Sequence, residues 1–150
     1  MTLSFKEITV DNFYECTKLD ANDDHKFVAT NVFSLAQSKY EPEYITMAIY
    51  NDETMVGFLM YKFDYPEKEL YLCRFMIDRN FQHMGFGKGA LDILKEIAMQ
   101  DPGIEKIGLS TNPENAHGIK VYEKFGFKDT GILDEGEEVF VLDLQKSQTK

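Results

Sequence analysis

One stretch decides how the rest of the chain is interpreted: Arg79-Asn80-Phe81-Gln82-His83-Met84-Gly85-Phe86-Gly87-Lys88-Gly89. It follows a strand-like run at residues 70–77 and opens a helix-like run at residues 90–99. Glycine permits positive φ and lets a ligand approach the backbone, while the first amides of a helix point outward at the positive end of its dipole. The stretch therefore predicts a phosphate or pyrophosphate site, to which Lys88 adds a charge. A glycine-rich turn needed only for tight packing is the alternative.

Two common phosphate motifs do not fit. The P-loop requires Ser or Thr after its lysine, whereas Gly89 follows Lys88. The dinucleotide fingerprint G-x-G-x-x-G requires a different last spacing from that of Gly85, Gly87 and Gly89. Instead, Gln82, Gly85 and Gly87 resemble the Q/R-x-x-G-x-G/A signature of the GCN5-related N-acetyltransferases. The resemblance implies that this loop holds the pyrophosphate of acetyl-coenzyme A, through Gln82, His83, Met84, Gly85, Phe86, Gly87, Lys88 and Gly89.

A second motif lies at residues 115–127 and resembles the family signature N-x-x-A/G-x-x-x-Y-x-x-x-G-F. Asn115, Gly118 and Tyr122 share one face of the expected helix. Asn115 and Tyr122 are then about 10 Å apart along its axis, so an elongated ligand can contact both ends. The resemblance assigns all three residues to the acetyl-coenzyme A site. An aromatic stripe that serves only the core is the alternative for Tyr122.

The apolar patterns follow the order β-α-α-β-β-β-α-β-α-β-β, which predicts one α+β domain over residues 1–150. This is also the element order of the family. The resemblance implies a central mixed, mostly antiparallel twisted sheet of about seven strands, with a splayed fourth strand and about four flanking helices. We expect strands at 3–10, 45–50, 55–63, 69–77, 104–110, 127–133 and 138–144, helices at 12–19, 26–38, 87–99 and 115–125, and a frayed end at 145–150.

Composition excludes several classes of protein. Hydrophobic and charged contents of 43% and 28% are typical of a soluble globular chain. No apolar run reaches the length of a membrane span, and no secretory signal opens the chain, so we expect a cytoplasmic protein. The net charge of −10 argues against a nucleic-acid partner. The two cysteines form no metal pattern with the histidines, so no metal is expected. A homodimer is compatible with the sequence, which does not define the oligomeric state.

The resemblance implies direct transfer of an acetyl group from coenzyme A to an amine, through a tetrahedral intermediate. The pantetheine arm would pair with the backbone at Phe75, Met76 and Ile77, and one amide there would polarise the thioester carbonyl. Tyr122 would protonate the departing thiolate, because a phenol is protonated at pH 7. For the general base, Glu69 is the first candidate and Glu41 the second, and a water chain without a dedicated base is the third alternative.

The acceptor is expected to be a small cationic amine, because the acidic balance attracts cations. Residues 27–37 and 74–78 resemble the bacterial spermine/spermidine acetyltransferases, which favours a polyamine. Some related polyamine enzymes have carboxylates on the fourth strand, just before the pantetheine-binding residues, where this chain has Cys73 and Arg74. Diamines, aminoglycosides, peptide or protein amines, and a non-catalytic acetyl-coenzyme A sensor stay as alternatives. The expected acceptor-site residues are Glu41, Asp64, Glu69 and Arg74, with Asp20, Asp23, Asp24, Glu43 and Glu67 adding to an acidic rim.

Overall fold

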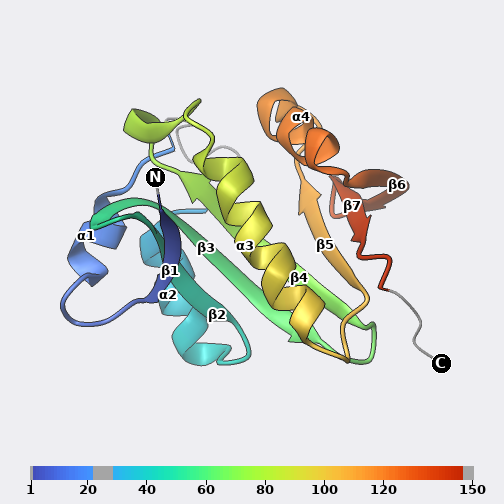
Figure 1. The fold of residues 1–150 in the computed structure, drawn as a ribbon, viewed down its shortest axis with the longest axis horizontal. Helices are drawn as coiled ribbons and strands as arrows, with labels where there is room; N and C mark the ends of the chain where they lie inside the picture. The colour runs from blue at the N-terminus through green and yellow to red at the C-terminus, as the bar shows by residue number, and fades with distance from the viewer. Residues whose placement is uncertain (1, 22–28, 147–150) are drawn as a thin grey trace. The chain divides into compact units, whose positions relative to one another are not determined.

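The computed structural model describes residues 2–21 and 29–146. Seven strands form one mixed sheet in the order β1-β2-β3-β4-β5-β7-β6 (Figure 1), which confirms the expected α+β fold. The strands are β1 Leu3–Glu7, β2 Ile45–Asn51, β3 Thr54–Asp64, β4 Glu69–Ile77, β5 Lys106–Thr111, β6 Lys128–Asp134 and β7 Glu137–Asp143. The helices are α1 Phe13–Lys18, α2 Asn31–Tyr40, the 3₁₀ turn η1 Arg79–Phe81, α3 Phe86–Gln100 and α4 Ala116–Phe125.

The pairing of the strands is largely antiparallel. β1 with β2, β2 with β3, β5 with β7 and β6 with β7 all run antiparallel. β4 and β5 run parallel, and their register joins Glu69–Tyr71 to Lys106–Gly108. The expected splay of β4 beyond Tyr71 stays a prediction.

The chain divides into two compact units. Unit 1 comprises Met1–Lys62 with Leu72–Ala90, and unit 2 comprises Phe63–Tyr71 with Leu91–Lys150. The core of unit 1 joins Cys16 of α1 to apolar side chains of β2, β3 and β4, including Ala48, Phe58 and Met76. In unit 2 the buried apolar side chains include Leu70, Ile107, Leu109, Phe127 and Phe140. The expectation of one domain stays a prediction.

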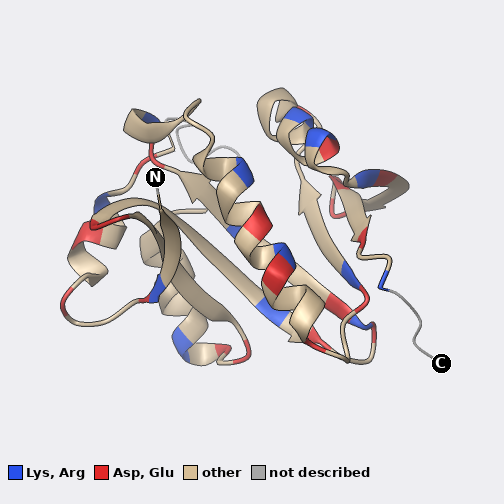
Figure 2. Ribbon diagram, viewed as in Figure 1, with Lys and Arg blue, Asp and Glu red and all other residues tan. Residues whose placement is uncertain are grey.

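Helix α3 shows why its sequence forms an amphipathic helix. Leu91, Leu94 and Ala98 are buried at helical spacing. Charged residues of both signs occur along the helix between these positions (Figure 2). Lys95 and Glu96 are among them, and both are exposed. The helix ends at Gln100, because Asp101 opens a turn with Pro102 and Gly103.

The structure corrects two expected elements near the N-terminus. The second helix is described from Asn31, and residues 29 and 30 are not helical, contrary to expectation, because Thr30 is extended and its hydroxyl accepts a hydrogen bond from the Phe33 amide. The first strand ends at Glu7 and not at residue 10, because the Asn12 side chain accepts from the Thr9 amide and closes a turn there. Asn12 therefore makes no side-chain cap for α1.

Other boundaries differ by one or two residues, the usual uncertainty of helix and strand ends. The expected start of the second helix at residues 26–28, and the rim residues Asp23 and Asp24, lie outside the described residues.

Candidate active site

The three glycines of the loop have three different structural roles, all within unit 1. Gly85 has φ +87, a backbone conformation that side chains with a Cβ rarely adopt. A Cβ on Gly89 would overlap the side chain of Leu3, so this glycine lets β1 approach the helix. A Cβ on Gly87 would meet only the Phe75 ring, at 4.0 Å. Of these glycines, Gly87 is therefore the one with open space beside a residue expected to contact the cofactor.

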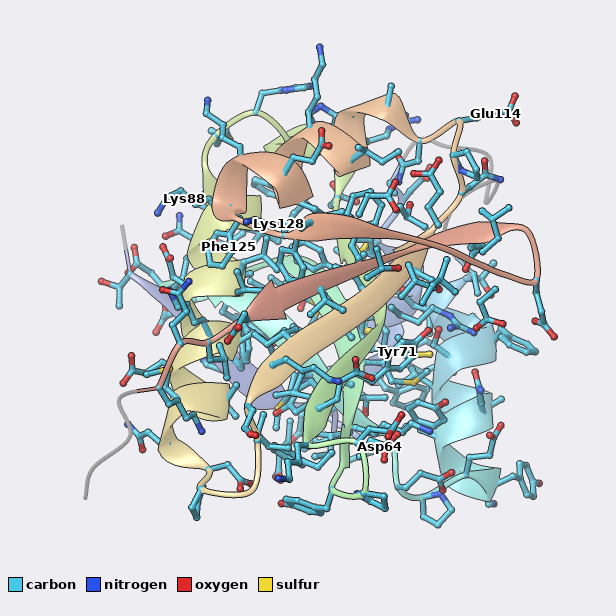
Figure 3. The ribbon with its side chains drawn as sticks, turned by 90° about the vertical axis from the view of Figure 1, so that its right-hand side faces the viewer. Asp64, Tyr71, Lys88, Glu114, Phe125 and Lys128 are labelled. Atoms are coloured by element: carbon cyan, nitrogen blue, oxygen red, sulfur yellow. The ribbon has the colours of Figure 1, made fainter. Side chains whose placement is uncertain are left out.

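The opening of α3 has the geometry of an anion site. The Gly89 amide donates to the Gly85 carbonyl at 3.0 Å, so the amides of Phe86 and Gly87 precede the first hydrogen bond of the helix. Lys88 is exposed and projects from the first turn of α3 (Figure 3). An anion placed here would meet helix amides, the positive end of the dipole and a lysine ammonium.

Gln82 positions this loop. Its side-chain amide donates to the carbonyl of Ala21 and to that of Ile77, both at 2.9 Å. Asp78, which is buried, accepts hydrogen bonds from the amides of Asp20 and Asn80 at 2.8 and 3.1 Å. The side chain of Gln82 thus fastens the start of the loop to the end of β4, and the expected cofactor contacts of His83 and Met84, both exposed, stay predictions.

The residues at the end of β4 differ in exposure. Met76 is buried in the core of unit 1, whereas Phe75 and Ile77 are half-buried. Phe75 approaches Gly87, so the structure brings together one residue from each expected part of the cofactor site.

Arg74 stands in a cluster of neutral partners. Its guanidinium donates to the Cys73 carbonyl and thiol, at 3.2 and 2.8 Å, and to the Gln37 side chain at 3.1 Å. Its Nε is buried and has no hydrogen-bond partner among the described residues.

Burial raises the pKa of the Cys73 thiol, and Arg74 opposes that shift. Burial also raises the pKa of Tyr44, and the Cys73 thiol and the exposed Glu41 add to it. Glu41 and Arg74 therefore lie around one Cys73–Tyr44 pair.

In unit 2, Asn115 uses its side chain to start α4. Its Oδ1 accepts from the Gly118 amide at 3.2 Å, and its Nδ2 donates to the Thr111 hydroxyl at 3.1 Å. A Cβ on Gly118 would overlap the Asn115 amide group. The group that lies over Gly118 is thus the side chain of Asn115, which anchors the helix to the end of β5.

Tyr122 lies in the C-terminal half of α4. Its ring packs edge-on against Phe127 with centroids 5.8 Å apart, so it also contributes to packing. Its carbonyl accepts from the amides of Gly126 and Phe127, at 3.1 and 3.0 Å. Burial raises the pKa of the Tyr122 phenol far above its ordinary value, so the phenol is protonated at neutral pH.

The expected acidic residues of unit 2 are spread along its strands. Glu69 opens β4, and its carboxylate lies against Gly108 of the neighbouring strand β5. Asp64 ends β3 (Figure 3) and accepts from the Glu67 amide in the turn that follows. Sequence reasoning missed a hydrogen-bonded set in this unit that joins Tyr71, Ser110 and Glu137. No sequence spacing connects these three, because they come from three different strands.

Within residues 2–21 and 29–146, no group of three or more His, Cys, Asp or Glu side chains could hold a metal ion. None of the helices in the described part of the chain combines the length and apolar character needed to cross a membrane.

Comparison with known proteins identifies the family. The family model for the acetyltransferase (GNAT) family matches residues 5–127. A spermine/spermidine N(1)-acetyltransferase of Bacillus subtilis (strain 168) is 30% identical over 152 residues, which cover 96% of this chain and 100% of that protein.

Two solved structures share the fold. The spermidine N-acetyltransferase from Vibrio cholerae in complex with CoA and spermine has a TM-score of 0.72 at 15% identity, covering 93% of this chain and 92% of that one. The ribosomal-protein-S18-alanine N-acetyltransferase from Escherichia coli has a TM-score of 0.71 at 17% identity, covering 98% of this chain and 97% of that one. The family match over most of the chain and the relative that is matched over its full length agree with this fold. The chain therefore belongs to the acetyltransferase (GNAT) family and is an acyltransferase.

Proposed function

We propose that this acyltransferase moves the acetyl group of acetyl-coenzyme A directly to a primary amine of a polyamine such as spermidine or spermine. The choice of acetyl-coenzyme A as the donor is supported by the opening of α3. There Gly87 has open space beside Phe75, and the first amides precede the first hydrogen bond of the helix. The acceptor class is supported by the B. subtilis relative, which is called a spermine/spermidine N(1)-acetyltransferase.

The residues of unit 1 fit the donor. The amides of Phe86 and Gly87, with the charge of Lys88, would hold the pyrophosphate. The backbone at Phe75, Met76 and Ile77 would align the pantetheine arm, and one amide there would stabilise the negative charge that develops on the carbonyl oxygen of the tetrahedral intermediate. The remaining loop residues Gln82, His83, Met84, Gly85 and Gly89 shape this site.

Tyr122 is the proposed general acid. Its phenol is protonated at neutral pH, and burial raises the pKa further, so it has a proton to donate to the departing thiolate. Asn115 and Gly118 would act by fastening the helix that carries Tyr122 to β5. Asp64, Glu69 and Glu41 would attract the cationic acceptor.

A second candidate acceptor is a peptide or protein amine that carries an acidic group. The observation that favours it is Arg74, whose buried Nε has no partner among the described residues and whose other donors contact neutral groups. A second cation, Lys62, lies 5.1 Å from the centre of the neighbouring Tyr44 ring. A guanidinium of this kind recognises carboxylates well, and a polycation would be repelled by it.

The test is a steady-state thiol-release assay with acetyl-coenzyme A and a panel of amines. The panel contains spermidine, spermine, a diamine, an aminoglycoside and an acidic peptide with a free N-terminus. Turnover of spermidine or spermine at the highest kcat/KM supports the polyamine acceptor, and preference for the peptide, lost in Arg74→Met, contradicts it.

Tyr122→Phe tests the general acid. We expect kcat to fall by about 100-fold or more, with little change in the Kd of acetyl-coenzyme A measured by calorimetry. The matched control is Tyr65→Phe, which removes an exposed phenol that donates to Asp101 at 2.8 Å, also in unit 2, and should keep full activity. Cofactor binding without turnover on any amine would instead identify a sensor of acetyl-coenzyme A.

A further inference from the structure

Three polar side chains from three strands of unit 2 form a continuous hydrogen-bonded chain. The Tyr71 phenol of β4 lies 3.3 Å from the Ser110 hydroxyl of β5. The Ser110 hydroxyl donates to the Glu137 carboxylate of β7 at 2.9 Å. All three residues are half-buried, so the chain is held by the sheet and is still accessible from one side. Tyr71 can be located beside the strands in Figure 3.

The strand register explains why these residues meet. Tyr71 pairs with Gly108 in the parallel ladder, and Ser110 lies two residues further along β5. Ser110 pairs with Val139, and Glu137 lies two residues before Val139 on β7. Because side chains repeat every two residues on one face of a strand, the three side chains share a face. Glu69, two residues before Tyr71, belongs to that face as well.

The hydrogen bonds of this chain have a direction. An ionised carboxylate only accepts, so the single hydroxyl proton of Ser110 is committed to Glu137. Ser110 can then join Tyr71 only as an acceptor, and the Tyr71 phenol must donate to it. A phenol oxygen can both donate and accept, so the Tyr71 oxygen can take up a proton as its own proton moves to Ser110, and a carboxylate stands at the far end of the chain.

We propose that Tyr71, Ser110 and Glu137 form a proton relay that deprotonates the acceptor amine. The inference rests on the proposed acetyl transfer. An ammonium N–H gives its proton to the Tyr71 oxygen as the phenolic proton passes to Ser110 and the Ser110 proton passes to Glu137. The amine loses one proton, the Glu137 carboxylate gains one, and both hydroxyl groups are restored. Tyr71 is the catalytic contact, and Ser110 and Glu137 act through it as positioning residues.

The reaction needs such a relay because an alkylamine has a reference pKa of about 10.4, so that fewer than roughly one molecule in a thousand is neutral at pH 7. One further feature suits a cation at Tyr71. The Glu69 carboxylate lies on the same face and adds negative charge. The relay replaces Glu69 and Glu41 as the proposed base.

The deciding variant is Glu137→Gln, because glutamine keeps the shape and can still accept from Ser110 but cannot take up the proton. With spermidine at pH 7 we expect kcat/KM of this variant to fall about 100-fold. The kcat/KM of Ser110→Ala and that of Tyr71→Phe should fall by a similar factor. The Ser110→Ala/Glu137→Gln double variant should lose no more than either single one, because a relay acts as a unit. Ser110→Thr, which keeps the hydroxyl, should restore activity, and Tyr65→Phe should match the wild type.

The pH dependence separates a relay from a structural role. The loss in Glu137→Gln should shrink steadily as the pH approaches 10, and should be absent at pH 7.5 for an acceptor amine with a pKa near 7. A loss that is equal at every pH and for both acceptors would overturn the proposal, and so would full activity of Glu137→Gln. If the wild-type protein turned over no amine at all, the proposed acetyl transfer itself would fail, which is a different outcome.

Discussion

Gln82 and Asn115 are the two residues whose structural roles differ most from a simple ligand contact. Each belongs to a family signature, and each uses its side-chain amide inside the protein, Gln82 on the carbonyls of Ala21 and Ile77 and Asn115 at the start of α4. Their proposed influence on the cofactor is therefore indirect. Gln82 orients a loop whose backbone amides would meet the proposed ligand, and Asn115 orients the helix of Tyr122.

Cys16 provides a residue-scale test of the core of unit 1. Its side chain is fully buried, and burial raises its pKa from 9.0 to about 12. A raised folded-state pKa gives stability that is complete below pH 9 and is lost as the pH rises from there towards 12. Each pH unit in that window should remove about 1.4 kcal/mol from the free energy of unfolding.

Urea denaturation at pH 8, 9 and 10, with a reductant present, measures this effect, and the comparison with Cys16→Ala separates it from the tyrosines, which begin to ionise towards pH 10. The free energy of unfolding of the wild type should fall between pH 9 and 10. Cys16→Ala lacks the thiol at this position and keeps Cys73, so its free energy of unfolding should decrease by about 1 kcal/mol less than that of the wild type. If the free energy of unfolding depended on pH in the same way for both proteins, the Cys16 thiol would not be buried and protonated as described.

At the scale of the element, α4 is defined at both ends by local chemistry. Asn115 caps its start, and Gly126, with φ +121, closes its end through the hydrogen bond of its amide to the Tyr122 carbonyl. The geometry of Tyr122 thus depends on a residue that has no expected contact with a ligand. The loop before α3 also contains a glycine with a positive φ, Gly85.

Replacing Gly126 with Ala should destabilise the protein by about 1–2 kcal/mol, because an alanine in the left-handed region is strained. The new Cβ would also lie 3.2 Å from the side chain of Leu142. The matched control is Gly87→Ala, whose φ is not positive and whose Cβ has space, and which should raise the stability by about 0.5 kcal/mol. Equal midpoints of the two variants in urea would show that the end of α4 does not require glycine.

At the scale of the whole molecule, charge decides which acceptors approach. The net charge of −10 attracts polycations and repels acidic peptides over distances set by the Debye length. Arg74 and Lys62 oppose this balance locally, around Tyr44 and Cys73 in unit 1. The long-range field therefore favours a polyamine, while this local cluster favours a carboxylate.

Salt should reveal which influence dominates. If a polyamine is the acceptor, kcat/KM for spermine should fall by about tenfold between 0.05 and 0.5 M NaCl, because screening removes the long-range attraction. A monoamine with one positive charge serves as the control and should respond much less. An equal response of the two amines, or a rise for spermine, would argue against electrostatic capture of a polycation.

Most elements of the fold were predictable, since their signals are local. The glycine-rich turn after β4, the amphipathic spacing of α3 and the Asn115–Gly126 boundaries of α4 each lie within one short segment. The prediction of helix at residues 29 and 30 was wrong, because the Thr30 hydroxyl caps a helix that begins at Asn31. The first strand ends at Glu7, before its predicted end at residue 10, for a similar reason: a side-chain hydrogen bond closes a turn there.

The sequence by itself determined the order of elements, the family and the loop expected to bind the donor. Tertiary structure alone decided what each loop glycine does and which partners Gln82, Arg74 and Asn115 take. It also assembled Tyr71, Ser110 and Glu137 into one hydrogen-bonded chain. The physical reason is register: a shift of one residue in β5 or β7 would turn Ser110 or Glu137 to the other face of the sheet. That register is set by long-range pairing and burial, which no local pattern in the sequence encodes.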